Sequence, residues 1–436
     1  VLNMGNDFYV DRGQLFIHND VSFTGTNALV YRSTVPSFIT SGATFNFNIN
    51  SIFDFRPSTT GTPELLAKDL LIMQDASSQL YLNGCTLKTT MTGLRLTKGQ
   101  LIFDNKVSLT SAAQLQLKST TTWVSEDYGN YVRVATWSHD GRFLAVGGNN
   151  PTSGNEIQIY TFNGSSLSLV ASQNYGDIIF TINWSPDGYF LAIGGNNPTS
   201  GNEIQVYSFN DSSLSIVTSQ DYGNAVYSAN WSPDGKYLAI GGGSPTSGNE
   251  IQIYTFNGSS LSLVTSQDYG TAVFKAKWSP DGKYLAVGGT VPTSGNEIQI
   301  YTFDGSSLSL VTSQDYGNIV HAVNWSHDGR YLVLGGYNPT SGNEIQIYTF
   351  NGSSLSLVAS QNYGTTVYAA NWSPDGRYLA LGGYVPTSDN EIQIYTFDGS
   401  SLSLVMSQNY GNYVFSTEWS LDGKYLAVGG WTPAAG

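Results

Sequence analysis

One stretch of sequence constrains the fold more than any other, because it recurs at a fixed spacing. Its clearest copy reads Asn-Trp-Ser-Pro-Asp-Gly-Lys-Tyr-Leu-Ala-Ile-Gly-Gly over residues 230–242. Seven tryptophans mark the copies, each 47 residues after the last: Trp137, Trp184, Trp231, Trp278, Trp325, Trp372 and Trp419. A fixed period of this length indicates repeated copies of one supersecondary unit that stack to bury a continuous core. We therefore expect these tryptophans to be structural core residues.

Each 47-residue unit carries four strand signals separated by turn residues. In the third unit the predicted strands are residues 225–231, 236–241, 250–256 and 260–267. Ser-Pro-Asp-Gly separates the first two strands, and Asn-Gly or Asp-Gly separates the last two, as in tight antiparallel turns. Units of this kind close into a ring, because radial repetition leaves only short, protected sheet edges. The sequence thus predicts an all-β chain with a seven-bladed β-propeller over residues 112–436.

The repeated pattern Val-x-x-(Ala/Val)-x-Trp-Ser-Pro-Asp-Gly-(Lys/Arg)-Tyr-Leu-Ala-(Ile/Val)-Gly-Gly resembles the middle of a WD40 repeat, and the resemblance covers all seven units. Two marks of that family are missing. Asp-Tyr-Gly or Asn-Tyr-Gly replaces the Gly-His pair, as at residues 221–223, and Ile-Tyr-Thr-Phe replaces the Trp-Asp ending, as at residues 253–256. The resemblance implies the propeller fold and a protein-interaction scaffold. It does not extend to the family's Asp-His-Ser/Thr-Trp hydrogen-bond network.

The last unit predicts how the ring closes. Only 17 residues follow Trp419, enough for a second strand but not for a third and fourth. Residues 114–118, Gln-Leu-Gln-Leu-Lys, resemble the third strand of a unit, and residues 121–129 resemble the fourth strand with its following loop. We expect the last blade to combine strands from residues 112–127 and 412–431, which would lock the ring at its seam.

Residues 1–111 have a two-residue periodicity instead. Phe45, Phe47 and Ile49 alternate with asparagines, as on a half-buried strand. Residues 13–24 resemble residues 99–110, and residues 79–87 form a third, imperfect copy. Short strands that recur with polar corners are typical of a parallel β-solenoid, which we predict for this domain. A small β-sandwich is the alternative.

The two ends of a solenoid present unpaired strand edges and an open core. No polar capping helix precedes Phe8, so the N-terminal end is predicted to stack on another copy. Repeated head-to-tail stacking would give an open filament. The alternative is that residues 1–7 fold over this end as a cap.

Composition limits the classes of partner. Charged residues make up 11% of the chain, the net charge is −14, and lysines and arginines do not cluster. A nucleic-acid partner needs a basic footprint, so none is expected. No apolar run reaches the roughly 18 residues of a membrane helix, so membrane insertion is not expected. A polar but weakly charged surface, and a chain that begins at Val1 rather than at a methionine, favour a processed extracellular or cell-surface protein. A cytoplasmic location is the alternative.

The repeats differ from one another at two places: around the start of each first strand and just after each Gly-Gly. Both places are predicted to share one face of the propeller. Aromatic side chains on such a face give a large contact area at a low entropic cost, so we expect binding there. The predicted binding residues are Tyr131, Arg133, Phe180, Tyr227, Phe274, Lys275, Lys277, His321, Tyr337, Tyr368, Tyr384, Tyr413, Phe415 and Trp431. Sequence drift, or packing of this face against the N-terminal domain, would also explain the variation.

No motif with catalytic or cofactor-binding spacing occurs, so we expect no enzyme activity, metal or cofactor. The Pro-Thr-Ser-Gly-Asn-Glu loops offer one carboxylate each, too few for calcium. The sequence favours a secreted or cell-surface structural protein, anchored or polymerised by its N-terminal domain, with the propeller displayed to another protein or a glycan. An intracellular WD40-like scaffold is the first alternative, and a lectin-like sugar-binding propeller is the second.

Overall fold

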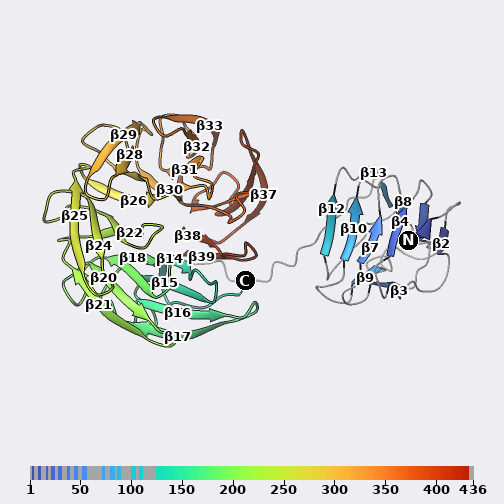
Figure 1. Ribbon diagram of the computed structural model, residues 1–436, viewed down its shortest axis with the longest axis horizontal. Coiled ribbons are helices and arrows are strands. Elements are labelled where there is room, and N and C mark those ends of the chain that lie inside the picture. The colour runs from blue at the N-terminus through green and yellow to red at the C-terminus, as the bar shows by residue number, and fades with distance from the viewer. Residues whose placement is uncertain are drawn as a thin grey trace. The chain divides into compact units, whose positions relative to one another are not determined.

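The computed structural model describes residues 124–431 throughout and, before them, the backbone of thirteen short strands between Leu2 and Thr110. The chain divides into two compact units, residues 1–123 and 124–436, which Figure 1 draws in blue and in cyan to red. The domain boundary after residue 111 stays a prediction, because residues 111–123 lie outside the described residues.

Strands of the first unit pair in parallel in three sheets. The first sheet has the order β1 (Leu2–Asn3), β4 (Val21–Thr24), β7 (Thr44–Phe47), β10 (Gln79–Asn83) and β12 (Gln100–Asp104). The second has the order β13 (Ser108–Thr110), β11 (Thr86–Thr89), β8 (Ile52–Phe55), β5 (Ala28–Tyr31) and β2 (Phe8–Val10). The third contains β3 (Phe16–Ile17), β6 (Ser37–Ile39) and β9 (Leu71–Met73). The choice between a solenoid and a sandwich stays a prediction.

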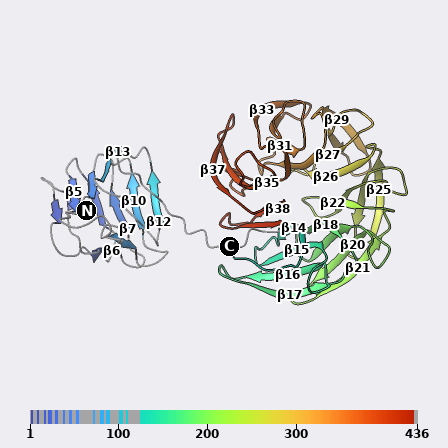
Figure 2. The same cartoon turned by 180° about the vertical axis from the view of Figure 1, so that it is seen from behind.

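The second unit is a β-propeller of antiparallel sheets, seen as a ring in Figures 1 and 2. The first strands are β14 (Tyr131–Trp137), β18 (Ile179–Trp184), β22 (Val226–Trp231), β26 (Ala272–Trp278), β30 (Val320–Trp325), β34 (Thr366–Trp372) and β38 (Val414–Trp419). The second strands are β15 (Phe143–Asn149), β19 (Phe190–Gly195), β23 (Tyr237–Gly242), β27 (Tyr284–Thr290), β31 (Tyr331–Gly336), β35 (Tyr378–Tyr384) and β39 (Leu426–Gly430). The strands of the third repeat lie within one residue of their predicted bounds.

Third and fourth strands complete six of these sheets. The third strands are β16 (Ile157–Phe162), β20 (Ile204–Phe209), β24 (Ile251–Phe256), β28 (Ile298–Phe303), β32 (Ile345–Phe350) and β36 (Ile392–Phe397). The fourth strands are β17 (Leu167–Gln173), β21 (Leu214–Gln220), β25 (Leu261–Gln267), β29 (Leu308–Gln314), β33 (Leu355–Gln361) and β37 (Leu402–Gln408). They lie at the outside of the ring in Figure 1.

The prediction of seven four-stranded blades is wrong for the residues that the structure describes. Six blades have four strands, and the seventh repeat forms only the two-stranded sheet β38–β39. Residues 114–118, expected to supply a further strand, lie outside the described residues, and residues 124–130 form no strand. We call the circle formed by the first strands of the seven repeats the inner circle. It still closes, because β38 contacts both β34 and β14.

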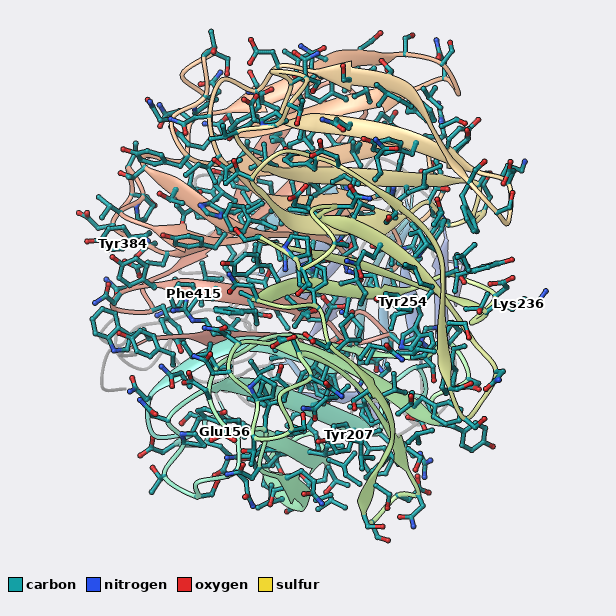
Figure 3. All side chains as sticks on the ribbon, turned by 90° about the vertical axis from the view of Figure 1, so that its left-hand side faces the viewer. Glu156, Tyr207, Lys236, Tyr254, Tyr384 and Phe415 are labelled. Carbon is teal, nitrogen blue, oxygen red and sulfur yellow. The ribbon has the colours of Figure 1, made fainter. Side chains whose placement is uncertain are left out.

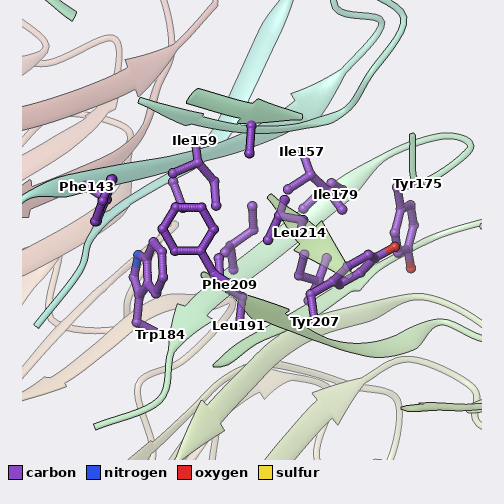
Figure 4. Close-up of a cluster of buried hydrophobic side chains, with 14 residues drawn as sticks. Phe143, Ile157, Ile159, Tyr175, Ile179, Trp184, Leu191, Tyr207, Phe209 and Leu214 are labelled. Atoms are coloured by element: carbon purple, nitrogen blue, oxygen red, sulfur yellow. The ribbon is translucent and has the colours of Figure 1, made fainter. Parts of the chain in front are cut away.

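The core lies between neighbouring blades. Figure 4 shows one such cluster, in which Phe143 and Ile159 of the first blade pack with Trp184 and Leu191 of the second. The Trp184 indole Nε1 donates a hydrogen bond to the Thr136 carbonyl of the first blade at 3.3 Å. The tryptophans of the second to sixth repeats are buried, at 5–8% exposure. Each repeated tryptophan of these blades thus packs between two neighbouring sheets.

Two repeated glycines are explained by close packing. A Cβ added to Gly241 would lie 2.4 Å from Val273 Cγ1 of the next blade, and one added to Gly242 would lie 2.3 Å from the Ala225 carbonyl oxygen. Any larger residue would therefore push apart two blades or two strands. Within the described part of the chain, no helix is long and apolar enough to cross a membrane.

Candidate functional site

Seven β-bulges position one side chain from each repeat at the inner circle. In β22 the pairing passes from Val226↔Gly242 to Ser228↔Gly241, so that Tyr227 is the extra residue. A bulge of this kind re-aims the side chain of the extra residue and bends the strand. The same step occurs in every first strand. The extra residues, which we call the axial ring, are Arg133, Phe180, Tyr227, Phe274, His321, Tyr368 and Phe415.

Members of the axial ring touch their neighbours all the way around. The centroid distances are 5.0 Å for Phe180–Tyr227, 5.1 Å for Tyr227–Phe274, 5.1 Å for Phe274–His321, 5.0 Å for His321–Tyr368 and 5.3 Å for Tyr368–Phe415. The Arg133 guanidinium carbon closes the circle, 4.2 Å from the Phe415 centroid and 6.0 Å from that of Phe180. Such contacts between a cation and ring faces are attractive. All seven side chains remain partly accessible to solvent.

A second group of aromatic residues gathers on one sector of the variable face. Tyr384 stacks on Tyr413 with centroids 4.0 Å apart and an interplanar angle of 9°. Tyr413 stacks on Trp431 at 5.6 Å, and Trp431 stacks on Tyr131 at 4.9 Å. We call these four residues, from repeats six, seven and one, the aromatic cluster. All four are partly exposed, and Figure 3 shows Tyr384 at the end of the propeller opposite Lys236.

The aromatic cluster continues into the axial ring. Tyr413 stacks on Phe415 at 5.4 Å, and Tyr131 lies 6.3 Å from the same ring. Of the other predicted binding residues, Tyr337 is 42% exposed and makes no aromatic contact among the described residues. The aromatic residues at the variable positions are therefore concentrated at the seam, the contact between the last and the first repeat. There they form one continuous surface, and they are not spread evenly around the face.

Three charged residues lie deeper along the inner strands. Lys275 and Lys277 are on β26, and Glu418 is on β38. Each is enclosed by protein, although solvent still reaches part of its side chain. The Lys277 Nζ donates a hydrogen bond to Asn230 Oδ1 at 2.7 Å. The sequence predicted Lys275 and Lys277 as binding residues, and the structure places both on the inner strand β26.

Burial shifts the charge balance in this region. It lowers the pKa of Lys275 to about 8, with Lys277 adding to the effect and Glu418 opposing it. Burial also raises the pKa of Glu418, which the two lysines oppose. Burial together with the charge of Lys275 lowers the pKa of His321 to about 4, so this imidazole is neutral at pH 7.

Comparison with known proteins bears on the fold. Residues 114–271 and 264–413 each match the family described as eukaryotic translation initiation factor eIF2A, and together they span more than half of the chain. The chain belongs to the eIF2A family. The family match and the ring of sheets together confirm the predicted propeller repeats.

Two further comparisons add less. No curated protein matches the chain. A solved structure of a putative 6-phosphogluconolactonase from Bacteroides uniformis is similar, with a TM-score of 0.50 and 17% identity over 63% of this chain and 85% of that chain. At this identity the likeness shows the fold alone.

The propeller of this eIF2A-family chain also contains a repeated polar contact that the sequence did not reveal. The Glu203 carboxylate accepts hydrogen bonds from the backbone amides of Tyr222 at 2.9 Å and Gly223 at 3.1 Å. The buried Tyr222 hydroxyl then donates to the Glu250 carbonyl of the next blade at 2.9 Å. We call this contact the Glu–Tyr latch. The carboxylate contact repeats from Glu156, Glu203, Glu250, Glu297, Glu344 and Glu391.

The Glu–Tyr latch explains the glutamate of each Pro-Thr-Ser-Gly-Asn-Glu loop as a structural residue. Their single carboxylates bind backbone amides, and the described residues contain no group of three or more His, Cys, Asp or Glu side chains that could hold a metal ion. A signal was present in the sequence, because the glutamate and the Tyr-Gly pair recur together at the 47-residue period. At the seam the pattern changes: the Gly129 amide bonds to Asp127 Oδ1 instead, at 2.8 Å.

Proposed function

We propose that this chain is a non-enzymatic binding protein whose propeller recognises a partner through the aromatic cluster. The observation that carries the proposal is the stack Tyr384–Tyr413–Trp431–Tyr131, which is partly exposed although aromatic side chains usually pack inside. Exposed aromatic residues that are held rigidly by stacking lose little entropy on binding, and they dominate many interfaces. The partner is another protein or a glycan.

The repeats supply substitutions that the fold already accepts. Asn149 and Asn196 occupy the position of Tyr384 and Trp431, and Ala225 and Ala272 occupy the position of Tyr413. A variant that combines Tyr384→Asn, Tyr413→Ala and Trp431→Asn therefore removes the cluster with residues used elsewhere in the ring. The matched control is Tyr189→Lys, which removes an aromatic side chain that is 67% exposed at the opposite turn.

The test is a quantitative affinity capture from the native source, followed by a glycan array with the same proteins. We expect a protein or glycan that the native chain and the Tyr189→Lys control retain equally and that the triple variant loses. Equal binding by all three proteins would refute the assignment to the aromatic cluster. Binding to a glycan rather than to a protein would favour the lectin-like alternative.

The N-terminal unit is proposed to be a short parallel β-solenoid that anchors or polymerises the chain. Support comes from the parallel pairing, and from β1 and β12, which each have a partner on one side only among the described strands. An open edge of this kind can pair with another copy.

The location is proposed to be extracellular or at the cell surface, on the basis of the weakly charged surface. The eIF2A family match supports the alternative, an intracellular interaction scaffold. Fractionation of the native source with an antibody to the propeller distinguishes these locations. The extracellular proposal predicts the chain in the medium or at the cell surface, and the scaffold alternative predicts it inside the cell.

A further inference from the structure

The inner strands carry charge in only a few of their repeats. One residue after the axial ring the repeats have Val134, Thr181, Ser228, Lys275, Ala322, Ala369 and Ser416. Three residues after it they have Thr136, Asn183, Asn230, Lys277, Asn324, Asn371 and Glu418. Repeat four thus places two ammonium groups where every other repeat has a neutral side chain or, in repeat seven, a carboxylate. These residues are not required by the blade architecture, because six other repeats form sheets without them.

The two lysines differ in how their charge is satisfied. Lys277 donates to Asn230 Oδ1 at 2.7 Å. The Lys275 ammonium has no hydrogen bond and no ion pair within residues 124–431, and only the more distant Glu418 favours its charge. Arg133, in the axial ring, has a buried Nε without a hydrogen-bond partner. Three cations therefore share the inner circle with a single carboxylate.

An enclosed cation without a counter-ion destabilises a fold. Lys275 is nevertheless present in a chain whose net charge is −14, at a position where Ala322 and Ala369 serve in other repeats. The destabilisation is relieved when an anion pairs with the ammonium group, since charge-assisted hydrogen bonds are the strong ones. Solvent reaches Lys275 and the axial ring, so a small ligand has a polar and an aromatic surface to contact.

We propose that the inner circle, next to the axial ring, binds a small organic anion. Its phosphate or carboxylate group pairs with the Lys275 ammonium, and its planar or apolar body rests on the axial ring. Phe274 directly precedes Lys275 in β26, and the His321 ring lies 5.1 Å from Phe274. Arg133 attracts the same anion from the opposite part of the ring. Lys277, whose Nζ is held by Asn230 Oδ1, supplies a further positive charge two residues along the same strand.

The experiment titrates the full chain with three probes, namely phenyl phosphate, benzoate and inorganic phosphate, by isothermal calorimetry at low ionic strength. We expect an aromatic anion to bind more tightly than inorganic phosphate, and the ranking of phenyl phosphate against benzoate identifies the preferred acid group. Lys275→Ala should weaken binding of the better probe by about tenfold or more. The control Lys236→Ala, which removes a lysine that is 73% exposed, should leave it unchanged.

Thermal unfolding without ligand gives a second, independent readout. Because a partly desolvated charge without a counter-ion destabilises the fold, Lys275→Ala should unfold at a higher temperature than the native chain, and the probe should raise the unfolding temperature of the native chain only. Failure of all three probes to bind the native chain would overturn the proposal. Undiminished binding by Lys275→Ala, or a lower unfolding temperature for this variant, would overturn it as well, since the lysine would then be structural.

Discussion

Single carboxylates hold neighbouring blades together in this propeller. The Glu250 side chain accepts two backbone amides, Tyr269 at 2.9 Å and Gly270 at 3.0 Å, in a loop that leads into the next blade. The Tyr269 hydroxyl then donates a hydrogen bond to the carbonyl of Glu297, which carries the next latch, so the latches link successive blades. Burial raises the pKa of this tyrosine well above its usual range.

Removing one latch carboxylate should be costly. Glu250→Ala leaves two backbone amides without an acceptor, and we expect the free energy of unfolding to fall by about 2–4 kcal/mol. Glu250→Gln keeps one acceptor oxygen and should cost less. Chemical denaturation of both variants checks the order, and an unchanged midpoint for Glu250→Ala would show that the latch contributes nothing.

His321 makes stability depend on pH at the same scale. Its folded pKa of about 4 lies below the usual value of 6.5, so the unfolded chain binds the proton more readily. The contribution of neutral His321 to the free energy of unfolding is fully present above pH 6.5. As the pH falls towards 4, the free energy of unfolding decreases by about 1–3 kcal/mol. His321→Phe, the residue present in repeats two, four and seven, should remove this loss. Denaturation of both proteins at pH 7 and pH 4 measures the difference, which should be zero if His321 is not enclosed.

At the scale of elements, the seam between the last and the first repeat differs from the other blade contacts. The sheet β38–β39 has two strands, and β39 has a partner on one side only among the described residues. The indole of Trp137, the tryptophan of repeat one, has no hydrogen-bond partner, which it shares with Trp372 of repeat six, whereas Trp278 bonds to the Asn230 carbonyl at 3.3 Å. The seam is held by the contacts of β38 and β39 with β14, and by the aromatic cluster.

The seam should therefore open first. We expect backbone amides of β39 to exchange with solvent about tenfold faster, or more, than those of β27, which has a partner on both sides. Deletion of residues 112–127 should increase the exchange across β38 and β39 and lower the unfolding temperature of the propeller. A cooperative melt unchanged by the deletion would show that these residues do not stabilise the seam.

At the scale of the whole molecule, the open edges of the N-terminal sheets predict self-association. Sedimentation of the full chain should show species larger than the monomer that increase with concentration. Tyr9→Pro removes a backbone donor from β2, which among the described strands pairs with β5 alone, and should reduce that association. A chain that stays monomeric at high concentration would exclude assembly through this edge.

Much of the architecture follows from the sequence by itself. Tryptophan spacing and turn residues predict four strands in each repeat, and the strands of the third repeat agree within one residue. This succeeds because turns and two-residue alternation are local, and because repetition shows the same local signal several times. The variation among repeats likewise predicts the residues of the axial ring and the aromatic cluster.

Tertiary structure alone decides how these residues meet. The bulge that turns Tyr227 inwards depends on a register shift against Gly241 and Gly242, which no single-strand pattern encodes. The inner circle, which brings Lys275 of repeat four near Glu418 of repeat seven, depends on ring closure. Within residues 124–431 the seventh repeat has two strands rather than the four that its sequence pattern predicted. The sequence determined the repeated unit because its causes are short-range. The site arises only when distant repeats are brought around one axis, and those contacts leave no local signal.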